Sequence, residues 1–120
     1  MLKKHYKDVE NKEASLQDGT PVPNVYVRWL VQKDDGAKNF AMRRFEIKPN
    51  GKVPLHSHPE EHEIYVLHGK GKFINDQGNE EYGEPGDVFY IPPLEQHSMI
   101  NIGNDNFVFL CIIPYLDKWI

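Results

Sequence analysis

The sequence predicts an all-β domain, either a sandwich or a closed barrel, built from roughly nine or ten short strands. Short apolar or alternating runs recur along the chain, and each is bounded by turn-forming residues; Gly and Pro number nine each. No segment shows the 3.6-residue periodicity of a convincing helix. With 120 residues, no repeat and no linker, the chain is expected to fold as one domain around a single core.

The expected strands follow one another at short, regular intervals, as in β-sandwiches and barrels. Between them lie turn sequences such as Asp34-Asp35-Gly36, Pro49-Asn50-Gly51 and Gly103-Asn104-Asp105-Asn106. The apolar pattern places strands at 25–31, 40–47, 62–68, 72–74, 80–82, 88–91, 97–101 and 107–113, with a further strand leading into His56.

Composition excludes several classes of protein. The net charge of −4 and the absence of a Lys/Arg cluster argue against binding to nucleic acid or to an anionic membrane. Cys111 is the only cysteine, which excludes an internal disulfide and favours a reducing compartment. No signal peptide or membrane span is recognisable, so a cytoplasmic location is expected.

The two ends of the chain are expected to behave differently from the rest. Residues 1–20 are polar and are predicted to form an N-terminal arm, frayed or packed on a partner subunit, ahead of a single domain over residues 21–120. The apolar pair Trp119-Ile120 also has little to pack against in one small barrel. Together these ends predict a homodimer.

Histidines mark the candidate site. His56 and His58 are two residues apart, so on a strand their imidazoles point to the same side. His62 follows after a turn, and His97 comes from a separate strand that a small barrel can bring alongside. Neutral imidazoles that converge on a rigid scaffold are what a divalent metal ion needs. Strand alternation alone leaves open whether His62 or Glu63 faces inward.

These motifs resemble those of the cupin family, whose double-stranded β-helix (jelly-roll) barrels bind a metal ion in the barrel mouth. The first cupin motif is matched by His56-Ser57-His58, then His62, then Gly69, and the second by Gly86, Pro92, His97 and Asn101. The resemblance covers residues 40–114. The chain departs from the pattern at Leu94, where the family usually has Gly, and Gly51 lies one residue nearer to the histidines than usual.

His62 occupies the position that usually holds a glutamate in this family. The resemblance therefore extends to an all-histidine subgroup of small, usually dimeric microbial cupins, for which manganese and oxidative chemistry are reported. It implies a divalent metal ion held by His56, His58, His62 and His97, with Mn²⁺ favoured and Fe²⁺, Ni²⁺, Cu²⁺ or Zn²⁺ as alternatives. Glu63 in place of His62, after a one-residue slip, remains the alternative ligand set, and a closed structural zinc site the alternative type of centre.

The remaining candidates would line the pocket beside the metal ion. They are Arg43, Phe45, Val53, Phe109 and Cys111, on strands next to the histidines. Arg43 is expected either to orient a substrate or to form an ion pair at the barrel rim. Phe109 and Cys111 border the cavity or belong to the plain core. Glu60, Glu61 and Glu63 form a solvated rim, one of them available to accept a hydrogen bond from a ligand imidazole, and His5 and His68 are expected at the surface.

Four protein ligands would leave two positions open on a six-coordinate ion, as at a catalytic centre. The leading hypothesis is therefore an oxidoreductase, similar to a dioxygenase, that acts on a small apolar or aromatic substrate. A non-enzymatic cupin that binds or senses a small molecule is the alternative. A sugar isomerase or epimerase is less favoured, because the expected lining lacks Lys and carboxylate groups.

Overall fold

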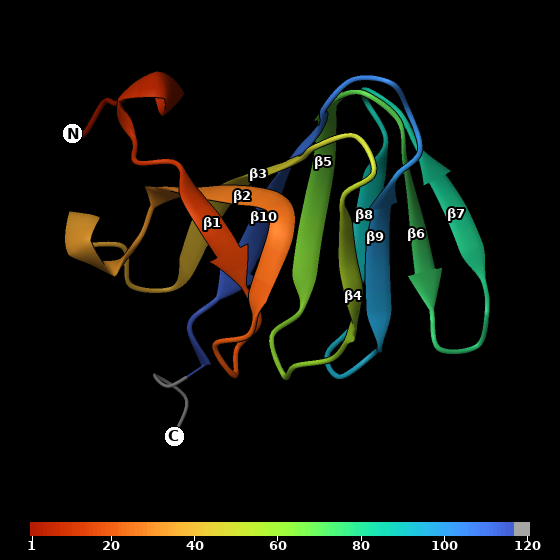
Figure 1. The fold of residues 1–120 in the computed structure, drawn as a ribbon. Helices are drawn as coiled ribbons and strands as arrows, with labels where there is room; N and C mark the ends of the chain where they lie inside the picture. Colours follow the sequence, from red (N-terminus) through yellow and green to blue (C-terminus); the bar gives the residue numbers. More distant parts are fainter. Residues whose placement is uncertain (117–120) are drawn as a thin grey trace.

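The computed structural model describes residues 1–116, and nearly all regular structure in them is β-strand (Figure 1). Two single-turn 3₁₀ helices accompany the strands, η1 (Tyr6–Asp8) and η2 (Lys33–Asp35). The strands are β1 (Lys12–Ser15), β2 (Pro21–Val31), β3 (Phe40–Ile47), β4 (Lys52–His56), β5 (His62–His68), β6 (Gly71–Asn75), β7 (Glu80–Gly83), β8 (Val88–Ile91), β9 (His97–Asn101) and β10 (Phe107–Pro114).

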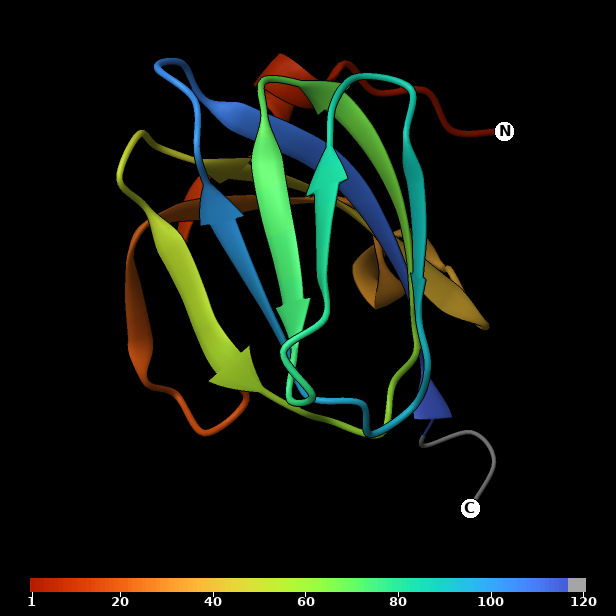
Figure 2. The same ribbon diagram turned by 90° about the vertical axis from the view of Figure 1, so that its right-hand side faces the viewer.

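The strands form two antiparallel sheets that enclose one core. The larger sheet has the order β1-β2-β3-β10-β5-β8, and the smaller has the order β4-β9-β6-β7 (Figure 2). Inward-facing side chains of both sheets fill the space between them, and the largest fully buried ones include Phe107, Phe109, Ile47 and Ile64. This architecture confirms the predicted all-β jelly-roll barrel.

Local sequence signals located several strands correctly. Strands 40–47, 88–91 and 97–101 begin and end where the pattern placed them. Strand β2 starts at Pro21 instead of Val25, because residues before Val25 pair with β1. No helix in residues 1–116 is long and apolar enough to cross a membrane.

Parts of the first twenty residues contact the rest of their own chain. Strand β1 pairs with β2 at the edge of the larger sheet, and Ala14 is buried there. Upstream, the Lys4 ammonium lies 2.8 Å from a carboxylate oxygen of Asp35, and the Arg44 guanidinium lies 4.2 Å from the centre of the Tyr6 ring. The sequence did not indicate β1, because four mostly polar residues give no apolar pattern.

The homodimer stays a prediction. The outer face of β5 and of the edge strand β8 exposes Tyr65, Val88 and Tyr90, a cluster of apolar surface that a partner could cover. Trp119 and Ile120, from which the dimer was also predicted, lie outside the described residues.

Gly69 closes the turn after β5 in a way that excludes any side chain. Its backbone has φ = 82°, and an added Cβ would overlap the carbonyl oxygen of Asn106 in the facing loop. Gly78 has a similar φ of 79°, but a Cβ there meets open space. We expect Gly69→Ala to lower the free energy of unfolding by about 2–4 kcal/mol and Gly78→Ala by only about 1 kcal/mol. Chemical denaturation of both variants measures the difference, and equal losses would contradict the predicted overlap with the Asn106 backbone.

Candidate metal centre

Four histidines meet at one end of the barrel. His56 ends β4, His58 lies in the loop that follows, His62 begins β5 and His97 begins β9. Strands β4 and β9 are paired with His56 opposite His97, which places the two rings 4.3 Å apart at their centres. Pro54 lacks a backbone N–H, and the register of this pair shifts between Val53 and His56.

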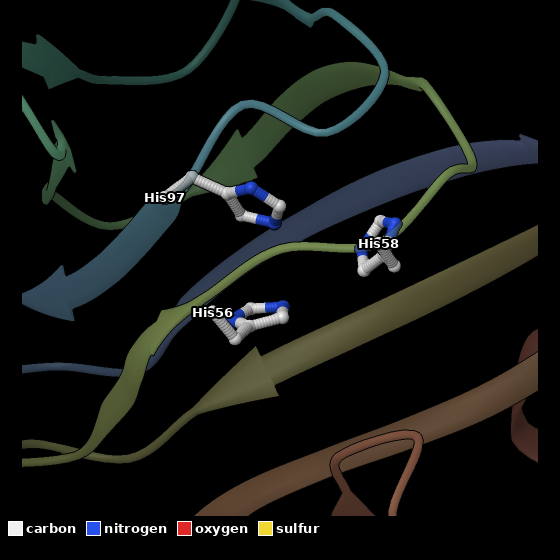
Figure 3. Close-up of side chains that lie close together, drawn as sticks. All are labelled: His56, His58 and His97. Atoms are coloured by element: carbon white, nitrogen blue, oxygen red, sulfur yellow. The ribbon is translucent and has the colours of Figure 1, made fainter.

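Three of these residues offer nitrogen atoms to one point in space. One ring nitrogen each from His56, His58 and His97 lies within 4.8 Å of the others. Figure 3 shows the three rings directed toward a common space from β4, the loop after it and β9. Nitrogen atoms gathered this closely form a candidate site for a single metal ion.

The hydrogen bonds of His56 and His97 orient their free nitrogens toward that space. In each ring Nδ1 lies 2.8 Å from a backbone carbonyl oxygen, of Pro54 and of Glu95 respectively. A carbonyl oxygen only accepts, so Nδ1 carries the hydrogen and Nε2 keeps a lone pair. Nε2 of His97 is buried with no hydrogen-bond partner among the described residues. A buried nitrogen lone pair that accepts no hydrogen bond is suited to bind a metal ion.

His62 also turns inward, and Glu63 does not. Alternation along β5 buries His62 with Ile64 and Val66, whereas Glu63 is exposed. Nε2 of His62 lies 2.7 Å from Nε2 of His58, and its Nδ1 lies 3.0 Å from the Cys111 thiol sulfur. One of the two Nε2 atoms must therefore carry a hydrogen in the metal-free protein, since two lone pairs at this distance repel.

Burial keeps the imidazoles of His58, His62 and His97 in the neutral form that binds metal ions. It lowers the pKa of His62 to about 2, assisted by the positive charge of Arg43, and lowers the pKa of His97 to about 4. The pKa of His58 is also lowered by burial, although the nearby Glu60 carboxylate opposes the shift. At neutral pH these rings are not protonated to imidazolium, so a metal ion does not have to displace a proton to bind them.

A cavity of about 90 Å³ opens beside the histidines. Of the residues predicted to line the pocket, Arg43, Phe45, Val53 and Phe109 do so. Cys111 lies behind His62, where its sulfur contacts His62 and accepts a hydrogen bond from Arg43. Most of the remaining wall is apolar, including Leu16, Val22, Met99 and Ile113.

The sequence did not reveal the contribution of the N-terminal segment to this cavity. Residues 14–17 line it, and the Gln17 side-chain amide donates to both carboxylate oxygens of Glu60, at 3.0 Å each. No local signal marks this long-range contact. Met99 was also missed, although its two-residue spacing from His97 places both on one face of β9.

Leu94 stabilises the loop that carries His58. Its backbone N–H donates to the His58 carbonyl oxygen at 2.9 Å, and its φ of 67° lies in the left-handed region. This conformation favours glycine, which is the residue that the family usually has at this turn.

The other histidines lie at the surface, as the sequence predicted, whereas Glu60 is half-buried and lines the cavity. His68 is at the surface, 2.9 Å from an Asp105 carboxylate oxygen, and His5 is exposed in the first turn. Among the acidic residues at the rim, Glu60 comes nearest to a ring, with an oxygen 3.7 Å from Nδ1 of His58.

Comparison with known proteins gives the family. The family model described as a cupin domain matches residues 43–113. A glucose-6-phosphate isomerase of Thermococcus kodakarensis is 32% identical over 124 residues, which cover 94% of this chain and 65% of the relative. An oxalate-binding protein of Thermotoga maritima is 40% identical over 81 residues, 67% of this chain and 64% of that protein. The chain thus spans slightly less than two thirds of each relative.

Among solved structures, the polyketide cyclase RemF of Streptomyces resistomycificus superposes with a TM-score of 0.86 at 34% identity. The match covers 95% of this chain and 79% of the cyclase. The matched family region contains all four clustered histidines. On its sequence, its barrel and these matches, the chain belongs to the cupin domain family.

Proposed function

We propose that the chain is a metal-dependent enzyme in which His56, His58, His62 and His97 hold one divalent metal ion, Mn²⁺ in preference. The proposed reaction is an oxidation of a small substrate that binds next to the ion through oxygen atoms. The observation that carries the proposal is the set of inward-directed imidazole nitrogens, one of them a buried lone pair without a donor.

The surrounding residues supply what four neutral ligands need. For both His58 and His62 to present Nε2 lone pairs, each ring must carry its hydrogen on Nδ1. The Cys111 sulfur lies 3.0 Å from Nδ1 of His62 and is placed to accept its hydrogen. A Glu60 oxygen, 3.7 Å from Nδ1 of His58, is in position to approach that ring in the same role.

The cavity limits the substrate. The cavity is small, about 90 Å³, and most of its wall is apolar. The walls formed by Phe45, Phe109 and Ile113 favour a small apolar body beside the oxygen donors. A bound Mn²⁺ would act as a Lewis acid for those oxygens and as a redox centre for dioxygen.

Protein side chains offer little acid–base catalysis. Besides the histidines, the titratable side chains that line the cavity among the described residues include one carboxylate, that of Glu60. The Gln17 amide donates hydrogen bonds to both of its oxygens. This disfavours an isomerase, which must move protons between carbon atoms, and favours a reaction centred on the metal ion.

A second candidate is a ring closure without oxidation, on an enolisable carbonyl compound. The 34% identity to a polyketide cyclase over 95% of this chain supports it. The two candidates differ in whether dioxygen is consumed.

The deciding experiment measures oxygen uptake by Mn²⁺-reconstituted protein with 1,3-diketones, phenolics and aryl alkenes, each tested with and without a carboxylate group. We expect oxygen consumption that matches substrate loss and that disappears in His97→Ala. Turnover of a diketone under anaerobic conditions would instead support the cyclase-type reaction. No turnover above that of free Mn²⁺ would contradict the proposed enzyme and leave a metal-assisted binding protein, for which the oxalate-binding relative is a precedent.

A further inference from the structure

Arg43 brings a permanent positive charge to the wall of the cavity. It lies on β3, paired with Trp29 on one side and Cys111 on the other. Its Nη2 donates to the Cys111 sulfur at 3.1 Å, and that sulfur lies 3.0 Å from Nδ1 of His62. The guanidinium is therefore two hydrogen-bond lengths from a candidate metal ligand.

No carboxylate compensates this charge among the described residues. The guanidinium carbon lies 4.8 Å from the centre of the Phe45 ring and 5.3 Å from that of Trp29, and its Nε is buried without a hydrogen-bond partner. Neutral aromatic faces and a thiol offset only part of the cost of removing an arginine from water. Within residues 1–116 Arg43 therefore forms no ion pair, which was the alternative for this residue.

Charge at the site increases further when a metal ion binds. Four neutral imidazoles leave both charges of a divalent ion uncompensated, and Arg43 adds a third. Within the cavity lining, only Glu60 is negative, and it is already hydrogen-bonded to Gln17. A neutral substrate would leave this excess of positive charge in an apolar pocket.

We propose that Arg43 determines specificity by binding the carboxylate of a small organic anion whose other oxygen atom faces the metal ion. This deepens the proposed function, on which it rests, by naming the substrate class as a carboxylate. The planar guanidinium lines the cavity, and its Nε–H has no hydrogen-bond partner among the described residues. The apolar walls then receive the uncharged remainder of the substrate.

The experiment compares an anionic probe with a neutral one. Oxalate and imidazole are titrated calorimetrically into Co²⁺-loaded wild type, Arg43→Met and Arg44→Met. Arg44 is the adjacent residue on the opposite face of β3, so R44M removes the same net charge away from the cavity. A charge-assisted hydrogen bond is worth roughly tenfold to a hundredfold in affinity.

We expect R43M to bind oxalate at least about tenfold more weakly than wild type and R44M, with unchanged imidazole binding. A third variant, Arg43→Lys, keeps the charge without the planar fork and is expected to fall between them. Oxalate binding by R43M within about twofold of wild type would overturn the assignment.

Failure of the metal site is recognised separately. If the wild-type protein does not bind Co²⁺ or imidazole, this result contradicts the proposed function and not the role of Arg43. In that event the rise in thermal midpoint that oxalate causes in metal-free protein tests Arg43 directly. We expect a rise in wild type and R44M and a smaller one in R43M; equal rises in all three would overturn the proposal.

Discussion

Replacing His62 by Ala is expected to weaken divalent-metal binding by at least about 100-fold, whereas Glu63→Ala is expected to leave it unchanged. Loss of a supporting outer residue typically costs tenfold to a hundredfold in affinity, and loss of a ligand costs more. His62 is 4% exposed beside the other rings, whereas its neighbour Glu63 is exposed on the opposite face of β5. Titration of Mn²⁺ or Co²⁺ into both variants, followed calorimetrically, measures the difference.

Two control experiments make this pair of variants informative. His68→Ala, a change of the same type at the exposed end of the same strand, controls for the loss of any histidine. Thermal unfolding of the metal-free proteins shows whether His62→Ala still folds. Wild-type affinity in His62→Ala together with weak binding in Glu63→Ala would show that the glutamate is the ligand and that His62 is not.

The metal-free protein is expected to lose several kcal/mol of stability between pH 6.5 and pH 4.5. In the folded protein the pKa of His62 is about 2 and that of His97 about 4, while both rings titrate near pH 6.5 in the unfolded chain. The unfolded state therefore binds more protons in this window, and stability falls as the pH falls. Two such histidines give a slope of up to about 2.7 kcal/mol per pH unit. Urea denaturation at half-unit pH steps measures this slope.

The carboxylates do not obscure this window. Asp18, Asp35 and Asp105 also have lowered pKa values, but their contribution is lost only near and below their unfolded value of 3.8. His62→Gln, which cannot titrate, is expected to reduce the slope by up to about half. A stability that does not change between pH 6.5 and pH 4.5 would contradict the neutral, buried state of these rings.

The fold could be predicted because its strands are marked at both ends. Val88–Ile91 is an apolar run and Phe40–Ile47 a mixed apolar and charged one, each bounded by turn residues, and both formed as expected. Strand β1 gave no such signal, because its one buried residue, Ala14, becomes apolar surface only when β2 lies beside it. The local sequence pattern thus identifies strands that contain several buried apolar residues. It misses a strand such as β1, whose one buried residue is covered only when a neighbouring strand pairs with it.

The same distinction applies to the site. The cupin motifs predicted that His56, His58 and His97 converge, although His58 lies in the loop after β4 and not on a strand with His56. The choice between His62 and Glu63 required the structure, since both alternating sets of β5 are largely apolar and only packing shows that Ile64 and Val66 face the core. The surroundings of Arg43 depend on side chains from neighbouring strands, which no spacing along the chain reveals.

The central claim is that four imidazoles hold one divalent ion, and X-ray absorption spectroscopy of Mn²⁺-loaded protein, with the metal content measured in parallel, tests it most directly. We predict one ion per chain with four imidazole nitrogens and up to two oxygen ligands in the first shell. A substoichiometric metal content, or a shell with two or fewer imidazoles, would contradict the account.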